Sequence, residues 1–266
     1  MSSCRAGACQ TCILRAKKGQ PPQAAQQSLK DTLRLSGCFL SCIAKPTSDL
    51  SIVRADESTE KVSARIEELV RLSPSVLRVR LRALGTFSYR AGQFLNFARP
   101  DGLTRSYSLA SVPGLEQDGL LELHVRLFPG GQLSEWFERQ AALGDVVELR
   151  GPIGECFYAP GRPEQPLLLI GSGTGLSPLY GIARDALAQG HRGPITLFHA
   201  GRTKERLYYR RELQQIAKDY SHFAYVPCVL EDTPNAADSE GVVVGKINEA
   251  VAARFPKAQG VRAFLC

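Results

Sequence analysis

The stretch "LLLIGSGTGLSPLYG", residues 167 to 181, decides the fold of the last third of this chain. Its first four residues are apolar, as in a strand buried inside a parallel sheet, and a glycine loop and a helical segment over 179–190 follow. Residues 194–201 and 211–220 have the patterns of the next strand and the next helix. This alternation predicts a parallel α/β domain over 163–266.

The glycine loop inside this stretch departs from the G-x-G-x-x-G fingerprint of dinucleotide-binding folds. Leu176 stands where the last glycine of that fingerprint would be, whereas Pro178 suits the first turn of a helix. Taken by itself, such a loop is as readily a tight turn as a nucleotide site.

Residues 61–159 carry the signals of an antiparallel barrel. In "LRVRLRA" (77–83) apolar residues alternate with arginines, which is the period of a half-buried strand, and further strand signals follow at 93–98 and 120–128. A helix expected over 132–143 interrupts the strands, with Ser134 as a candidate N-cap and Gly144 just past its end.

Four cysteines near the start have the spacing of iron–sulfur ligands. Cys4, Cys9 and Cys12 form a C-x4-C-x2-C motif, and Cys42 follows after 29 intervening residues, which suits a plant-type [2Fe-2S] cluster. A structural zinc site is the alternative, but zinc modules usually use two C-x2-C pairs. Cys38 competes with Cys42 for the fourth position, and the spacing favours Cys42.

Composition narrows the class of protein. The 266 residues carry a net charge of +7, and residues 1–55 hold eight basic and two acidic side chains, which gives +6 there. These basic residues are scattered without interleaved aromatics, which argues against nucleic acid as a partner. No apolar run reaches about 18 residues and no secretory signal is present, so we expect a cytoplasmic protein away from membranes. Clustered thiols in such a chain favour metal ligands over disulfides.

The motifs together resemble one family. "CRAGACQTC" (4–12) and "GCFLSCIAKPTSDL" (37–50) look like the ferredoxin module of reductases that serve bacterial ring-hydroxylating oxygenases. "RSYSLA" (105–110), set between "YRAGQFLNF" and "HVRLFPGGQLSEWF", is similar to the flavin domain of the ferredoxin–NADP reductase superfamily. The resemblance implies an α/β multidomain fold with a β-grasp module over 1–53, an FAD-binding barrel over 61–159 and an NAD(P)-binding domain over 163–266.

Both ends of the chain stop inside elements that this family has complete. The hairpin that precedes the cluster loop in the family has no counterpart before Cys4, and "VRAFLC" ends at Cys266, where the family continues as C-G-x-P. We therefore expect a sequence truncated at both ends, with a partial β-grasp module.

The resemblance also implies roles for residues of the barrel. Arg105 is expected to neutralise the FAD pyrophosphate, Tyr107 to pack on the flavin, and Ser108 to hydrogen-bond near flavin N5, where a guanidinium and a hydroxyl suit the chemistry. We expect no acid–base role for His124. The strand and the phosphate turn expected beside the cofactor contribute His124, Val125, Arg126, Gly131, Gln132, Leu133 and Ser134.

In the last domain the loop matches the family's G-x-G-T-G-x-x-P dinucleotide loop. Gly173, Thr174, Gly175 and Pro178 are its expected binding residues, with Thr174 near the nicotinamide. Together with Ser108 and Cys266, Thr174 forms the expected catalytic set. Arg202, with two cations that follow it, suits the 2′-phosphate of NADPH, but similar runs occur in relatives that use NADH, which we favour slightly.

These modules form an electron path. A hydride carries two electrons from NAD(P)H to FAD, and a [2Fe-2S] cluster accepts them one at a time and passes them to a redox protein, expected to be a terminal oxygenase component. The alternatives are a non-functional or metal-binding remnant of such a reductase, and a stand-alone diaphorase.

Overall fold

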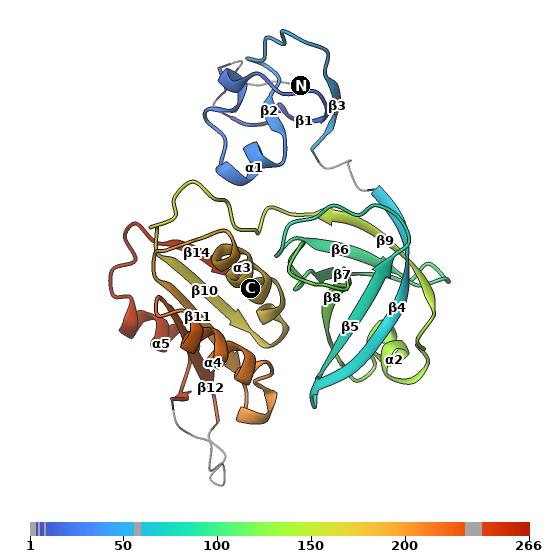
Figure 1. Ribbon diagram of the computed structural model, residues 1–266, viewed down its shortest axis with the longest axis vertical. Helices are drawn as coiled ribbons and strands as arrows, with labels where there is room; N and C mark the ends of the chain where they lie inside the picture. Colours follow the sequence, from blue (N-terminus) through green and yellow to red (C-terminus); the bar gives the residue numbers. More distant parts are fainter. Residues whose placement is uncertain (1–3, 5, 8, 56–59, 232–240) are drawn as a thin grey trace.

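The computed structural model describes residues 4, 6–7, 9–55, 60–231 and 241–266. It has three parts: a small N-terminal module at one end of the long axis, and a β-barrel and a parallel-sheet domain side by side below it (Figure 1). Residues 56–59, within the segment that joins the N-terminal module to the barrel, and residues 232–240 lie outside the described residues. Within the described ranges, no helix has the length and apolar character needed to cross a membrane.

The N-terminal module is a three-stranded antiparallel sheet with β1 in the middle. Its small core includes Leu29, Leu33 and Leu40 together with two cysteines. This sheet agrees with the β-grasp class expected for the module. Its elements are β1 (Ile13–Lys18), η1 (Gln23–Gln26), α1 (Asp31–Leu35), β2 (Cys38–Leu40) and β3 (Ser51–Arg54).

The middle part is a six-stranded antiparallel barrel with the strand order β7-β6-β9-β4-β5-β8. A bridge between Leu109 and Leu123 links the two edge strands. The alternation read from 77–83 is confirmed, because Val79 and Leu81 are fully buried in the barrel core. The elements are β4 (Glu60–Ser73), β5 (Val76–Ala83), β6 (Phe94–Ala98), β7 (Thr104–Ser108), β8 (Leu121–Arg126), α2 (Gln132–Arg139) and β9 (Val146–Ile153).

The N-cap expectation for Ser134 is wrong. Gly131 is the N-cap of α2, and Ser134 lies inside the first turn of the helix. The Ser134 Oγ atom is 2.9 Å from the Gly131 carbonyl oxygen and 3.0 Å from that of Phe128, and it accepts the Phe128 N–H at 3.2 Å. Since the hydroxyl folds back onto the preceding turn, it shapes that turn instead of capping the helix.

The C-terminal part is a five-stranded parallel sheet with the order β13-β12-β11-β10-β14, as the strand–helix alternation predicts. Helices α3 and α4 cover one face and α5 packs on the other. Strand β10 points its carboxyl end toward the barrel (Figure 1). The elements are β10 (Leu167–Ser172), η2 (Gly173–Gly175), α3 (Leu176–Ala188), β11 (Ile195–Gly201), η3 (Lys204–Arg206), α4 (Arg210–Asp219), β12 (Phe223–Val229), β13 (Val243–Val244), α5 (Ile247–Arg254) and β14 (Arg262–Leu265).

Candidate active site

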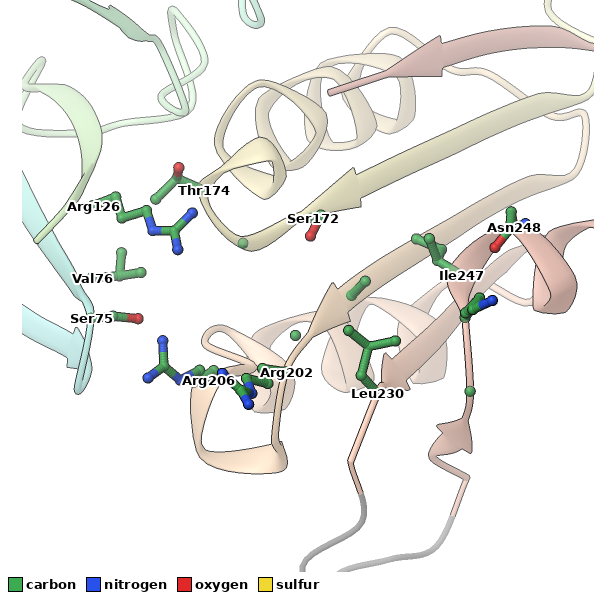
Figure 2. A pocket seen from close by; sticks show the side chains of 15 residues that line it. Ser75, Val76, Arg126, Ser172, Thr174, Arg202, Arg206, Leu230, Ile247 and Asn248 are labelled. Atoms are coloured by element: carbon green, nitrogen blue, oxygen red, sulfur yellow. The ribbon is translucent and has the colours of Figure 1, made fainter. Parts of the chain in front are cut away.

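A cavity of about 460 Å³ lies between the barrel and the carboxyl ends of the parallel strands. In open α/β sheets, ligands bind beyond the carboxyl ends of the strands. Figure 2 shows Arg126 and Val76 entering from the barrel, and Thr174 facing them from the glycine loop. Its lining residues are Ser75, Val76, Arg126, Ser172, Gly173, Thr174, Ala200, Gly201, Arg202, Arg206, Leu230, Gly245, Lys246, Ile247 and Asn248.

The cavity lining is cationic. Arg126, Arg202, Arg206 and Lys246 contribute to it, and none of the described lining residues is acidic. The nearest carboxylate partner belongs to Glu231, whose Oε1 lies 3.0 Å from Arg202 Nε in an exposed ion pair. A guanidinium-rich wall of this kind suits phosphate groups. The residues present therefore fit a dinucleotide.

The glycine loop allows the end of β14 to approach closely. A Cβ atom on Gly175 would lie 2.4 Å from the Cys266 carbonyl oxygen, so only glycine fits here. This approach places Cys266 beside the loop that carries Thr174, as two main-chain hydrogen bonds confirm: Cys266 donates to Ile170 and accepts from Ser172. Pro178 is the third residue of α3, inside the first turn as expected.

A second cysteine that sequence reasoning did not single out meets this chain end. The thiol of Cys156, from the segment after β9, hydrogen-bonds to the thiol of Cys266 and lowers the pKa of Cys266. The same contact, together with burial, raises the pKa of Cys156. Both thiols are free. The contact joins the barrel side of the molecule to the last strand of the parallel sheet.

Strand β7 presents the expected flavin-binding residues. Arg105 and Tyr107 lie two positions apart, and burial raises the pKa of Tyr107 to about 12 while the Arg105 cation opposes that rise. The Tyr107 ring meets the Phe97 and Phe137 rings edge-on, at 6.2 and 6.1 Å between centroids. The Ser108 carbonyl accepts the Ser177 hydroxyl at 3.0 Å, which ties the strand to α3.

The turn before α2 is closed by hydrogen bonds within the chain, one of which runs from the Gly131 N–H to the Phe128 carbonyl at 2.9 Å. A Cβ on Gly131 would lie 2.5 Å from Ser134 Oγ and 3.0 Å from the Phe128 carbonyl oxygen, so the turn closes tightly around this glycine. The Gly130 N–H donates to Glu135 Oε1 at 2.8 Å, which shows that the main chain at this helix start holds a carboxylate. Exposed Arg105 is a guanidinium of the kind that suits a pyrophosphate group, the anionic part of FAD.

Three of the expected cofactor residues have side chains that are buried against other parts of the protein. Leu133 and Val125 are buried in the barrel core, so contacts of theirs with a cofactor would involve the main chain alone. His124 is also buried and bonds to Glu122 and Tyr208. By contrast, Arg126 reaches the cavity, and Gln132 begins α2.

The cysteine loop is organised by the sheet beneath it. Cys12 immediately precedes β1 and Cys42 follows β2 by two residues, so the Ile13–Leu40 register brings these two cysteines together. Ser41 fixes the pair by donating both its N–H and its hydroxyl to the Cys12 carbonyl, at 3.1 and 3.0 Å. Cys4 Sγ accepts the N–H of Cys9 at 3.3 Å, so the loop holds Cys4 and Cys9 together as a second pair.

Hydrogen bonds favour anionic sulfur at Cys9 and Cys12, whereas a hydrogen bond with Cys12 and burial raise the pKa of Cys42. A hydrogen bond from the Thr11 hydroxyl, 3.1 Å from Cys9 Sγ, is the largest cause that lowers the pKa of Cys9 to about 6. Burial alone would raise the pKa of Cys12, but hydrogen bonds from Cys42 hold it below its ordinary value. Four thiols, in two pairs and with N–H groups directed at sulfur, fit the two irons of a [2Fe-2S] cluster.

A single metal ion is a poorer fit. Among the described residues, no three His, Cys, Asp or Glu side chains are grouped closely enough to ligate one ion. Cys38 is buried in the module's core and borders a separate cavity at the junction with the barrel, beside Gln93 and Glu155. Burial raises the pKa of Cys38.

Comparisons with known proteins identify the family. The chain matches three family descriptions: 2Fe-2S iron-sulfur cluster binding domain over 1–47, oxidoreductase FAD-binding domain over 63–158, and oxidoreductase NAD-binding domain over 169–266. The reductase subunit of an aromatic O-demethylase from Amycolatopsis is 34% identical over 278 residues, with 100% of this chain and 81% of that protein covered. The chain belongs to the ferredoxin–NADP reductase superfamily. It is an NAD(P)H-dependent flavin and iron–sulfur oxidoreductase of the electron-transfer type.

Two further relatives support this assignment of the reductase. The reductase component of a Pseudomonas phenol 2-monooxygenase is 33% identical, with 99% of this chain and 77% of that protein covered. The crystal structure of an Amycolatopsis cytochrome P450 reductase superposes with a TM-score of 0.72 at 31% identity, covering 100% of this chain and 81% of that one. FAD, a [2Fe-2S] cluster and NAD(P)H are therefore the reductase's cofactors.

Proposed function

We propose that this reductase takes electrons from NAD(P)H in the cavity beside the glycine loop and delivers them singly, through the cysteine loop, to a separate terminal oxygenase component. The observation that carries the proposal is the cavity itself, because the barrel's Arg126 and the loop's Thr174 line the same space. A nucleotide seated there lies against both cofactor-binding parts of the chain. The functional units that we assign are 1–53, 61–159 and 163–266.

Each of the expected site residues has a distinct role in this proposal. Arg105 and the main chain around Gly131 hold the FAD pyrophosphate, and Tyr107 covers the flavin, whose chemistry when bound is to accept a hydride and release single electrons. Ser108 and Thr174 orient the reacting groups, and Cys266 lies beside Thr174. The expected ligands of the cluster are Cys4, Cys9, Cys12 and Cys42.

The ion pair between Arg202 and Glu231 supports NADH as the nucleotide. A carboxylate 3.0 Å from Arg202 already satisfies that cation and repels a 2′-phosphate placed near it. A ribose hydroxyl, in contrast, donates readily to a carboxylate. We therefore assign NADH as the favoured donor, with Arg202 beside its adenine ribose.

The acceptor is assigned from the names of the relatives and from charge. Several relatives are described as reductase components of phenol, naphthalene and terephthalate oxygenase systems. In this chain, residues 1–55 carry eight basic and two acidic side chains. Complementary charge speeds the encounter of redox proteins. An oxygenase component with an acidic face around its own redox centre fits this module.

A paired variant tests the path. The reductase is reconstituted with FAD and the cluster, and NADH is the electron donor. The assay compares the rates at which two acceptors are reduced: cytochrome c, a one-electron acceptor, and ferricyanide, which can take electrons from the flavin. Cys12→Ser is expected to abolish reduction of cytochrome c and to leave reduction of ferricyanide close to the parent rate. Cys38→Ser, in the same module, is the control and is expected to retain both activities.

The opposite pattern would contradict the proposal. If Cys12→Ser reduced cytochrome c at the parent rate, the flavin itself would be the exit point and the chain would act as a diaphorase. If Cys38→Ser lost the cluster's visible absorbance and Cys12→Ser kept it, the ligand assignment would be wrong.

A further inference from the structure

A buried polar cluster joins the barrel to the parallel-sheet domain. It consists of Glu122, His124, Tyr208 and Tyr209, which we call the interdomain tetrad. Their exposed fractions are 7%, 3%, 2% and 8%. The first two lie on β8 and the last two immediately precede α4, so each domain contributes two members.

Hydrogen bonds connect all four members. His124 Nε2 lies 2.9 Å from Glu122 Oε1 and His124 Nδ1 lies 3.0 Å from the Tyr208 hydroxyl. The Tyr209 hydroxyl donates to the same Glu122 oxygen at 2.7 Å. The network is satisfied when His124 Nε2–H donates to Glu122 and Nδ1 accepts the Tyr208 proton. Glu122 is therefore the hub of the contacts between the two domains.

Two arginines of the barrel add positive charge around this hub. Arg78 donates to the Tyr209 hydroxyl at 3.2 Å, and Arg80 Nε lies 3.8 Å from Glu122 Oε2. A buried carboxylate is costly unless it is paired and hydrogen-bonded, and such a network is satisfied in one arrangement only. The tetrad and its arginines thus select a single placement of the two domains.

Tyr209 holds a backbone conformation that is unusual for an aromatic residue. It is the N-cap of α4 with φ 55° and ψ 25°, in the left-handed region that bulky side chains seldom occupy. Its ring packs against Tyr180 at 4.9 Å and His124 at 5.1 Å. This conformation directs the hydroxyl across the domain junction to Glu122, so its contacts on the barrel side compensate for the local strain.

The tetrad adjoins the cavity on both of its sides. Arg126, the next residue on the same face of β8 after His124, lines the barrel wall. Arg206, two residues before Tyr208, lines the opposite wall, and Figure 2 shows the two guanidinium groups reaching into the space between the domains. Fixing β8 against the segment 201–209 therefore fixes the width of the cavity.

We propose that Glu122, acting through Tyr209 and His124, is a positioning residue that holds the nucleotide-binding wall of the cavity at a set distance from the flavin-binding barrel. The inference rests on the proposed function of the cavity. Hydride transfer demands close alignment, and a misplacement of about 1 Å can cost roughly 100-fold in rate. Loosening the tetrad should therefore slow flavin reduction more than it weakens nucleotide binding.

The test uses Tyr209→Phe, which removes one hydroxyl and keeps the ring. Tyr225→Phe is the matched control, because the Tyr225 hydroxyl is buried and has no hydrogen-bond partner in the described part of the chain. Anaerobic stopped-flow with NADH gives the limiting rate of flavin reduction and the Kd of the nucleotide. For Tyr209→Phe we expect the rate to fall roughly tenfold and Kd to change by less than about threefold, with Tyr225→Phe close to the parent.

Hydrogen exchange of the FAD-loaded protein without nucleotide supplies a second readout. Amides of 202–209 are expected to exchange faster in Tyr209→Phe, while those of α3 stay protected. A Glu122→Gln and Tyr209→Phe double variant should show effects that do not add, since both changes disrupt the same contact.

Each result decides something. Equal flavin-reduction rates in Tyr209→Phe and Tyr225→Phe overturn the proposal, and faster exchange alongside an unchanged rate leaves the tetrad a purely structural element. If NADH does not reduce the parent protein, the function proposed for the cavity is refuted. Hydrogen exchange in the parent and in Tyr209→Phe still decides whether the tetrad fixes the segment 202–209.

Discussion

Replacement of Gly175 by alanine should destabilise the parallel-sheet domain for steric reasons alone. Gly175 has φ −60° and ψ −15°, which alanine adopts freely, so the backbone conformation adds no cost. The new Cβ, however, would lie 2.4 Å from the carbonyl oxygen of Cys266 and 2.6 Å from its carbonyl carbon. Main-chain atoms cannot rotate away as a side chain can, so the end of β14 has to move.

The displacement of Cys266 determines how much stability Gly175→Ala loses. Moving Cys266 breaks its hydrogen bonds to Ile170 and Ser172, at 2.9 and 3.1 Å, and each backbone hydrogen bond contributes about 1 kcal/mol net. Overpacking adds about 1–3 kcal/mol. We expect the free energy of unfolding to fall by about 3–5 kcal/mol from these two contributions.

Urea denaturation followed by far-ultraviolet circular dichroism measures this change. Gly85→Ala is the control, since its Cβ would meet only a methyl group of Val62 at 3.2 Å. A Gly175→Ala variant within about 0.5 kcal/mol of the parent, the range of an ordinary surface substitution, would refute the close approach of β14 to the loop.

Three other changes test the cofactor sites. Arg105→Ala should release FAD more readily than the parent during gel filtration, because the pyrophosphate loses its counter-charge. Ser108→Ala should retain FAD but be reduced more slowly by NADH. Equal reduction rates in Ser108→Ala and the parent would remove the role of Ser108 near flavin N5. Glu231→Gln should raise the preference for NADPH over NADH, measured as a ratio of kcat/KM values, by about two- to fivefold, as expected for one exposed ion pair. Glu164→Gln is the control and should leave this ratio unchanged, because its partner Arg192 lies outside the cavity lining. Reduction of the protein acceptor should slow as ionic strength rises while reduction of a neutral dye stays constant, and an acceptor rate indifferent to salt would leave the basic residues without a docking role.

Local patterns predicted much of the architecture. The alternation at 77–83 reports a strand with one buried face, and the apolar run before the glycine loop reports a strand buried in a parallel sheet. Both are consequences of period and burial within one element, so both can be read from consecutive residues. The N-cap of α2 could not be read so simply, because Gly131 and Ser134 both suit a helix start and only the fold of the turn decides between them.

The interdomain tetrad lay beyond such local reasoning. Glu122 and His124 could have been recognised as an outward-facing polar pair on β8, since they alternate with buried leucines. Their partners Tyr208 and Tyr209 lie more than 80 residues away, at 84 and 87 positions of separation for the printed contacts. Which polar groups meet across two domains depends on how the domains dock, which no local pattern in one domain encodes. The contact between Cys156 and Cys266 was missed for the same reason.

The most direct test of the electron path is anaerobic reduction of the reconstituted reductase by NADH, followed at the flavin absorbance and by electron paramagnetic resonance of the cluster. We predict that the flavin absorbance bleaches and that the signal of a reduced [2Fe-2S] cluster then appears in the parent and in Cys38→Ser but not in Cys12→Ser. A parent protein whose flavin is reduced by NADH while its intact cluster stays oxidised would contradict the path from nucleotide through flavin to cluster.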